Sequence, residues 1–190
     1  MKVRILLLFG ISLAIFGGSS FSNPQLVTAV PAPLFKPILK DIPNQLPRDM
    51  VIRLPSSVPE AGIEGVNTYA IVRGYQNEYQ GGMFGVDFAS RNDCSVTACN
   101  MGNIFVSRGN PLNENDSLLE NRRQAKPINL KAGIRGFYFY ARSGSAGYRH
   151  HVFWEQNGLF FEVESRALSK QQVINMAISM ANEPPIKSAR

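Results

Sequence analysis

The sequence contains few of the residues from which most catalytic and metal centres are built. Its 190 residues include two cysteines, two histidines and one tryptophan. The histidines, His150 and His151, are adjacent, and adjacent strand residues point to opposite faces, so the pair is poorly placed to bind one metal ion. The two cysteines would need two further zinc ligands, and the nearby sequence offers none. We therefore expect no metal site and no cofactor.

A dense basic cluster is also missing. The 20 Lys and Arg residues outnumber the 14 Asp and Glu residues, but they are spread along the chain. The tightest group is Arg122, Arg123 and Lys126 in a polar stretch. Nucleic-acid-binding surfaces usually carry denser basic clusters with interleaved aromatic residues. This excludes nucleic acid as the expected partner.

Long hydrophobic runs are confined to the N-terminus. Ile5–Phe16 is almost wholly apolar, follows the basic residues Lys2 and Arg4, and is clearly shorter than the roughly 20 residues of a membrane-spanning helix. Ser20 and Ser22 supply small residues at the −3 and −1 positions of a signal-peptidase site. This predicts a cleaved signal peptide over residues 1–22, with an uncleaved anchor as the alternative. We expect export to the periplasm or the extracellular space, with no transmembrane span after cleavage.

The cysteines lie close together in DCSVTAC, at Cys94 and Cys99. In an exported chain, an even pair at this spacing predicts a local disulfide. The alternative is a redox or metal pair, but redox pairs favour two intervening residues. We expect a structural disulfide.

A β-hairpin is the strongest local signal in the chain. Asn157–Gly158 suits a type I′ turn, in which both central residues have positive φ. Counting outward places Trp154 opposite Phe161 and Val152 opposite Val163, so these four share one apolar face. The same register places His151 opposite Glu164.

An amphipathic helix is predicted after the hairpin, and a shorter one near the start of the domain. Ser169 is a natural N-cap and Gln172 completes a capping box, while prolines follow the helix. The apolar stripe should cover the Val152–Trp154 face of the hairpin. Leucine and isoleucine spacing predicts the earlier helix over Leu34–Asp41. The C-terminal stripe consists of Val173, Met176, Ala177, Met180 and Ala181.

Short strand patterns fill most of the remaining chain and predict an α+β fold. We expect an antiparallel sheet of about seven short strands, with the N-terminal and C-terminal helices packed on one face. The expected strands outside the hairpin are Met50–Leu54, Asn67–Arg73, Tyr79–Ala89, Met101–Ser107, Pro127–Leu130 and Ile134–Ala141. The expected organisation is a signal peptide (1–22), a flexible leader (23–33), a single domain (34–182) and a C-terminal tail (183–190).

Aromatic residues are concentrated in adjacent strands, and alternation sends half of them away from the helix-covered face. Phe153, Phe160, Phe137 and Phe139 form a candidate surface binding patch on that outer face. The alternative is packing within the domain.

The set of motifs resembles one protein family. LFKPILKDI, RLPSSVP, DCSVTACNMG and WEQNGLFFEV, together with the terminal helix, are similar to a group of uncharacterised exported proteins common in cyanobacteria. The resemblance covers residues 34–181 and implies an exported α+β domain. It implies no reaction, so no catalytic residue is carried over.

Two functional hypotheses follow. The first is a non-enzymatic module that binds or scaffolds an unknown partner of the bacterial cell envelope, such as an envelope component or an apolar ligand. Its basis is the missing catalytic set together with the outer-face aromatic residues. The second is a hydrolase-like enzyme whose site combines distant polar residues, with Asp87, Asp93, His150 and Glu164 as candidates.

Overall fold

The computed structural model describes residues 30–59, 67–75, 82–109, 123–142 and 147–189. The expected signal peptide and most of the expected leader lie outside these residues. Most of the polar stretch between residues 108 and 126 does so too.

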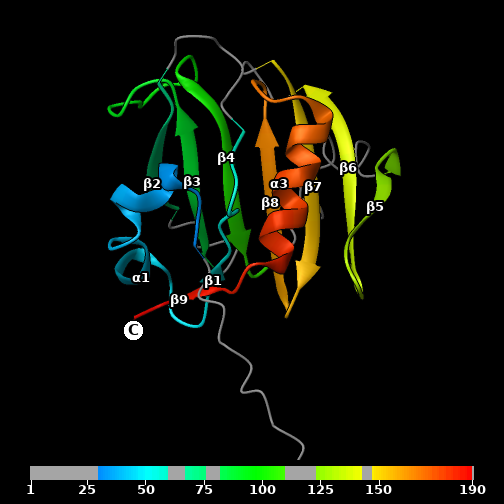
Figure 1. Ribbon diagram of the computed structural model, residues 1–190, viewed down its shortest axis with the longest axis horizontal. Helices are drawn as coiled ribbons and strands as arrows, with labels where there is room; N and C mark the ends of the chain where they lie inside the picture. Colours follow the sequence, from blue (N-terminus) through cyan, green and yellow to red (C-terminus); the bar gives the residue numbers. More distant parts are fainter. Residues whose placement is uncertain (1–29, 60–66, 76–81, 110–122, 143–146, 190) are drawn as a thin grey trace, which may run out of the picture.

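The main element is an antiparallel sheet of seven strands, in the order β2-β3-β4-β8-β7-β6-β5 (Figure 1). The predicted antiparallel sheet of about seven strands is therefore confirmed. All neighbouring strands pair antiparallel. Neighbours in the sheet are also consecutive in the chain, except that β4 pairs with β8. On its other side β8 pairs with β7, the strand that precedes it in the chain. The strands are β2 (Tyr69–Tyr75), β3 (Met83–Ala89), β4 (Asn100–Ser107), β5 (Lys126–Lys131), β6 (Ile134–Arg142), β7 (Tyr148–Gln156) and β8 (Leu159–Ser165).

The hairpin of β7 and β8 has the predicted register. Trp154 pairs with Phe161 and Val152 with Val163, and all four side chains are buried. Both turn residues, Asn157 and Gly158, have positive φ (55° and 75°), as a type I′ turn requires. The turn chemistry therefore fixes which hairpin side chains share a face.

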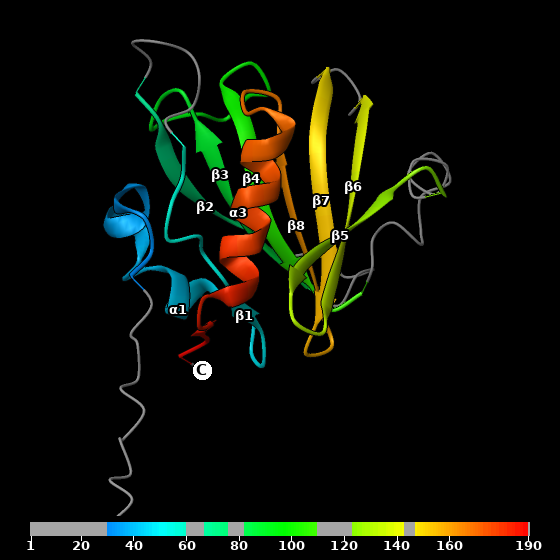
Figure 2. The same ribbon diagram turned by 45° about the vertical axis from the view of Figure 1, so that its right-hand side comes forward.

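Helix α3 (Lys170–Asn182) begins with the predicted capping box. Ser169 Oγ accepts a hydrogen bond from the Gln172 backbone N–H at 3.4 Å, and Gln172 Oε1 accepts from the Ser169 N–H at 2.8 Å. The helix crosses β8 and β7 on one face of the sheet (Figures 1 and 2). Its apolar stripe joins Val152, Trp154 and Phe161 in the main core. The opposite side of the sheet is called the outer face below.

The N-terminal helix differs from the prediction. Instead of one helix over Leu34–Asp41, the chain forms a 3-10 helix η1 (Pro33–Ile38) and a single α-helical turn α1 (Ile42–Gln45). The reason is proline, which lacks an N–H and is tolerated only where a helix begins. Pro37 lies within the 3-10 segment, where it cannot donate the hydrogen bond of a regular α-helix, and Pro43 lies in the first turn of α1.

A small second sheet joins two segments that are far apart in the sequence. β1 (Val51–Ile52) pairs with β9 (Ile186–Lys187) rather than joining the main sheet. Ser188 Oγ also donates to the Leu46 carbonyl at 3.1 Å, 142 residues earlier. Part of the expected C-terminal tail therefore contacts a segment near the start of the domain.

Candidate functional site

A row of polar side chains crosses the middle of the outer face. The strand register places Asp87, Asn103, Glu164 and His151 side by side on β3, β4, β8 and β7. Phe139 on β6 ends the row. Central strands of a sheet hold such side chains in fixed positions, because each strand is hydrogen-bonded on both sides.

His151 is the centre of the most compact group in this row. Its Nδ1 lies 2.6 Å from Glu162 Oε1 and 3.3 Å from Glu164 Oε2. Glu162 and Glu164 are two residues apart on β8, so both side chains point to the same face. All three side chains are buried, with His151 and Glu162 each 4% exposed.

Glu164 is held from its other side by two hydrogen-bond donors. Arg149 Nη1 donates to Glu164 Oε1 at 2.9 Å, and Asn103 Nδ2 donates to the same oxygen at 3.0 Å. Arg149 is only 3% exposed, so this is a buried ion pair. The second oxygen of Glu164 remains directed toward His151.

Burial and charge shift the proton affinities of this group. Burial alone lowers the pKa of His151, but the hydrogen bond and charge of Glu162, with the charge of Glu164, raise that pKa above its ordinary value. Burial raises the pKa of Glu164, and the charge of Glu162 adds to this, against the opposing effects of His151, Arg149 and Asn103. A proton on His151 therefore stabilises two neighbouring carboxylates.

The candidate aromatic patch lies beside this group, but it is mostly buried. Phe153, Phe160 and Phe139 are 4%, 2% and 5% exposed, and Phe137 is partly buried. The ring of Phe139 stacks on His151 with centroids 4.4 Å apart. The four rings are on the outer face as predicted, but they form a second apolar cluster rather than an open surface, because they pack against one another and against Phe105.

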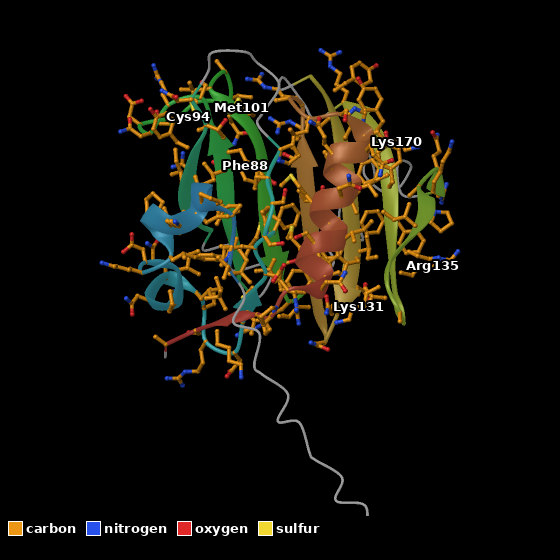
Figure 3. All side chains as sticks on the ribbon, in the orientation of Figure 1. Phe88, Cys94, Met101, Lys131, Arg135 and Lys170 are labelled. Atoms are coloured by element: carbon orange, nitrogen blue, oxygen red, sulfur yellow. A yellow bond between two sulfur atoms is a disulfide. The ribbon has the colours of Figure 1, made fainter. Side chains whose placement is uncertain are left out.

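A pocket of about 320 Å³ opens near the end of the sheet where β5 begins. Lys126, the first residue of β5, pairs with Tyr138 of β6. Lys170, at the start of α3, lies beside β6 in Figure 3, and its Nζ is 4.8 Å from the centre of the Tyr138 ring. The pocket is lined by Gln124, Lys126, Tyr138, Phe139, Tyr140 and Lys170.

His150 supports the wall of this pocket on the face that α3 covers. Its Nδ1 lies 2.9 Å from the Tyr138 hydroxyl. Burial lowers the pKa of His150, and His151 and Lys170 lower it further. Burial and Tyr140 raise the pKa of Tyr138. The hydrogen bond between the Tyr138 hydroxyl and the His150 imidazole holds the tyrosine ring in place.

The four residues proposed for an enzyme site do not come together. Asp87 and Glu164 are on the outer face but are separated by β4, whereas His150 faces the α3 side. Asp93 is exposed and pairs with Arg91 at 3.1 Å. Arg73 holds Asp87, with Nε donating to Oδ2 at 3.0 Å.

The cysteines are joined as predicted. The sulfur atoms of Cys94 and Cys99 lie at disulfide distance, 2.07 Å. Both residues are buried with Ala89 at the end of β3, and Arg73 donates a hydrogen bond to the Cys94 carbonyl. The loop containing Cys94 lies beyond the end of β3 (Figure 3). The disulfide is therefore buried and closes the loop that follows β3, as a structural disulfide does.

Sequence reasoning missed Glu162 as a partner of His151, and Arg149 and Asn103 as partners of Glu164. A signal for Glu162 was present, because two acids two residues apart on one hairpin strand share a face with a histidine on the facing strand. Arg149 follows from the same alternation. Asn103 depends on the pairing of β4 with β8, which no local pattern specifies.

Comparison with protein-family models, curated proteins and solved structures gave no match. The resemblance to exported cyanobacterial proteins therefore stays a prediction. Within the described residues, no helix is long and apolar enough to cross a membrane.

Proposed function

We propose that the chain is an exported, non-enzymatic binding module whose pocket holds a small ligand with an anionic group and a flat apolar part. The observation that carries this proposal is the pocket between β5, β6 and α3, which combines two lysines with aromatic side chains. Ligand sites are typically concave and apolar, with a few polar groups that fix orientation.

The side chains of the pocket specify the kind of ligand. Lys126 and Lys170 come from different elements and supply positive charge, while no acidic residue is among the described lining residues. Tyr138 is buried and Tyr140 is 55% exposed, so the aromatic wall is accessible through Tyr140. A carboxylate, sulfonate or phosphate would bind the lysines while a ring or chain packs on the tyrosines.

The setting of this module is the cell envelope. This part of the proposal is supported by the signal-peptide pattern over residues 1–22 and by the disulfide pair, since disulfides persist in oxidising compartments. An anionic envelope component of small size meets the chemistry of the pocket.

An aromatic sulfonate dye, anilinonaphthalene sulfonate, provides a direct test. Its fluorescence should titrate one site in the full chain, and K126Q/K170Q should weaken binding about tenfold or more, which is about 1.4 kcal/mol. The matched control is K131Q/K187Q, which removes two exposed lysines elsewhere and should leave affinity within about twofold. Native mass spectrometry of protein purified from its own envelope would then identify a retained ligand.

Two results would contradict this function. One is equal dye affinity for the pocket variant and the control variant. The other is a protein from its own envelope that carries no small molecule and shows no saturable dye binding.

A further inference from the structure

The outer face holds three potential metal ligands in a small space. The donor atoms of His151, Glu162 and Glu164 all lie within 4.8 Å of one another. β8 supplies both carboxylates from the same face of the strand, and β7 supplies the imidazole from the position that pairs with Glu164. Because β7 and β8 are central strands joined by a tight turn, the three donors are positioned before any ion arrives.

The donor set suits a first-row divalent cation. Imidazole nitrogen is a common ligand of zinc, nickel and iron, and carboxylates bind zinc and manganese. Nδ1 of His151 faces both carboxylates, at 2.6 Å and 3.3 Å, so a cation bound between them would take the place of the Nδ1 proton. Three protein ligands leave at least one coordination position for water.

The surroundings resemble the second layer of a metal site. Arg149 and Asn103 both donate to Oε1 of Glu164, which leaves Oε2 directed to the imidazole. Phe139 stacks parallel to the His151 ring, with an angle of 4° between the planes, and so fixes its orientation. Such outer contacts orient ligands and strengthen metal binding.

Electrostatics also favour an ion here. Two carboxylates are buried next to each other and beside an aromatic cluster, where the low dielectric makes their repulsion costly. Arg149 pairs directly with only one of them, Glu164. We propose that His151, Glu162 and Glu164 bind one divalent transition-metal cation, a site on the face of the sheet opposite α3.

The test uses Zn²⁺ and the full chain, stripped of metal with a chelator that is then removed. In competition with a fluorescent zinc indicator, the wild type should bind one Zn²⁺ per chain. H151Q and E162Q should each weaken the affinity at least tenfold. The matched controls are H150Q, the adjacent histidine on the other face, and E155Q on the same strand as His151; both should stay within twofold of the wild type.

Circular dichroism shows which variants fold. Because a variant that does not fold gives no information on binding, a second measurement uses the wild type itself. In ¹⁵N-histidine NMR spectra, Zn²⁺ should shift the Nδ1 resonance of one imidazole, and this shift should persist in H150Q. The proposal is overturned if the wild type binds no stoichiometric Zn²⁺, if H150Q weakens binding as much as H151Q, or if neither imidazole shifts. K126Q/K170Q, the variant that tests dye binding, leaves His151, Glu162 and Glu164 unchanged. The dye and zinc experiments can therefore fail independently, and each failure contradicts only one of the two proposals.

Discussion

Replacing Arg149 with methionine tests whether the buried ion pair on the outer face is required for folding. Arg149 and Glu164 form a 2.9 Å ion pair with side chains 4% and 12% exposed. Removing one partner of a buried pair costs about 3–5 kcal/mol, because the other charge stays buried without compensation. His151 and Asn103 still contact Glu164, so we expect about 3 kcal/mol, the lower end of that range.

The matched control is Arg91→Met, because Arg91 pairs with Asp93 at a similar distance, 3.1 Å, with side chains 58% and 74% exposed. Exposed pairs contribute about 0–1 kcal/mol, so the control should change stability little. The assay is urea unfolding followed by the fluorescence of Trp154, which is 1% exposed, in the presence of a chelator. Equal losses in R149M and R91M would refute the reasoning.

The same variant has a predictable pH dependence. Burial already raises the pKa of Glu164 above its ordinary 4.5, and loss of the Arg149 charge should raise that pKa further. The native state then holds this proton more tightly than the unfolded state, so native stability falls as pH rises from about 4.5 through the folded pKa. The deficit of R149M should therefore be larger at pH 8 than at pH 5, and R149M/E164Q should recover part of it at pH 8. A deficit that is constant with pH would mean that Glu164 is not the group left unpaired.

Three further predictions concern the sheet, the helix and the pocket. Gly102→Ala would place a Cβ 2.4 Å from the Glu164 carbonyl oxygen, so it should cost about 1–3 kcal/mol in urea unfolding. Gly74→Ala meets nothing within 4 Å and should cost nothing; equal effects would contradict the close approach of β4 and β8. Ser169→Ala removes the α3 cap and should cost about 1 kcal/mol, and a loss below about 0.3 kcal/mol would argue against the capping box. In an alkaline absorbance titration, the difference between wild type and Tyr138→Phe should show one phenol ionising above the ordinary pKa of 10.0; ionisation at or below that value would contradict the burial of Tyr138.

Interactions between residues close in the sequence are sufficient to predict the hairpin and α3. Asn157–Gly158 sets a turn type, the turn sets the register, and the register places His151 opposite Glu164, as the structure has them. The capping box at Ser169 likewise depends on residues three apart. In both cases the interacting groups are close in the sequence, so a short sequence pattern is enough to predict their contact.

The remaining parts depend on contacts between distant residues. The register predicts that His151 faces Glu164, but it does not predict that both are buried, because burial depends on how the whole outer face packs. The position of β1 outside the main sheet depends on β9, which has only two residues and no strand pattern of its own. Local apolar spacing around Leu34 favoured a regular helix, but the prolines and the packing of Phe35 into the core selected a 3-10 segment.

The small β1–β9 sheet has a consequence for the order of folding. Hairpin β7–β8 brings together neighbouring residues and needs little loop closure, whereas the Leu46–Ser188 contact closes a loop spanning 142 positions. During synthesis on a ribosome, α1 and β1 emerge long before their partner segment. Until then β1 lacks the strand with which it pairs, and the core that fully buries Ile42, Leu46 and Ile52 is incomplete. The interval before Ile186 and Lys187 arrive is when the nascent chain is most exposed to chaperones and proteases.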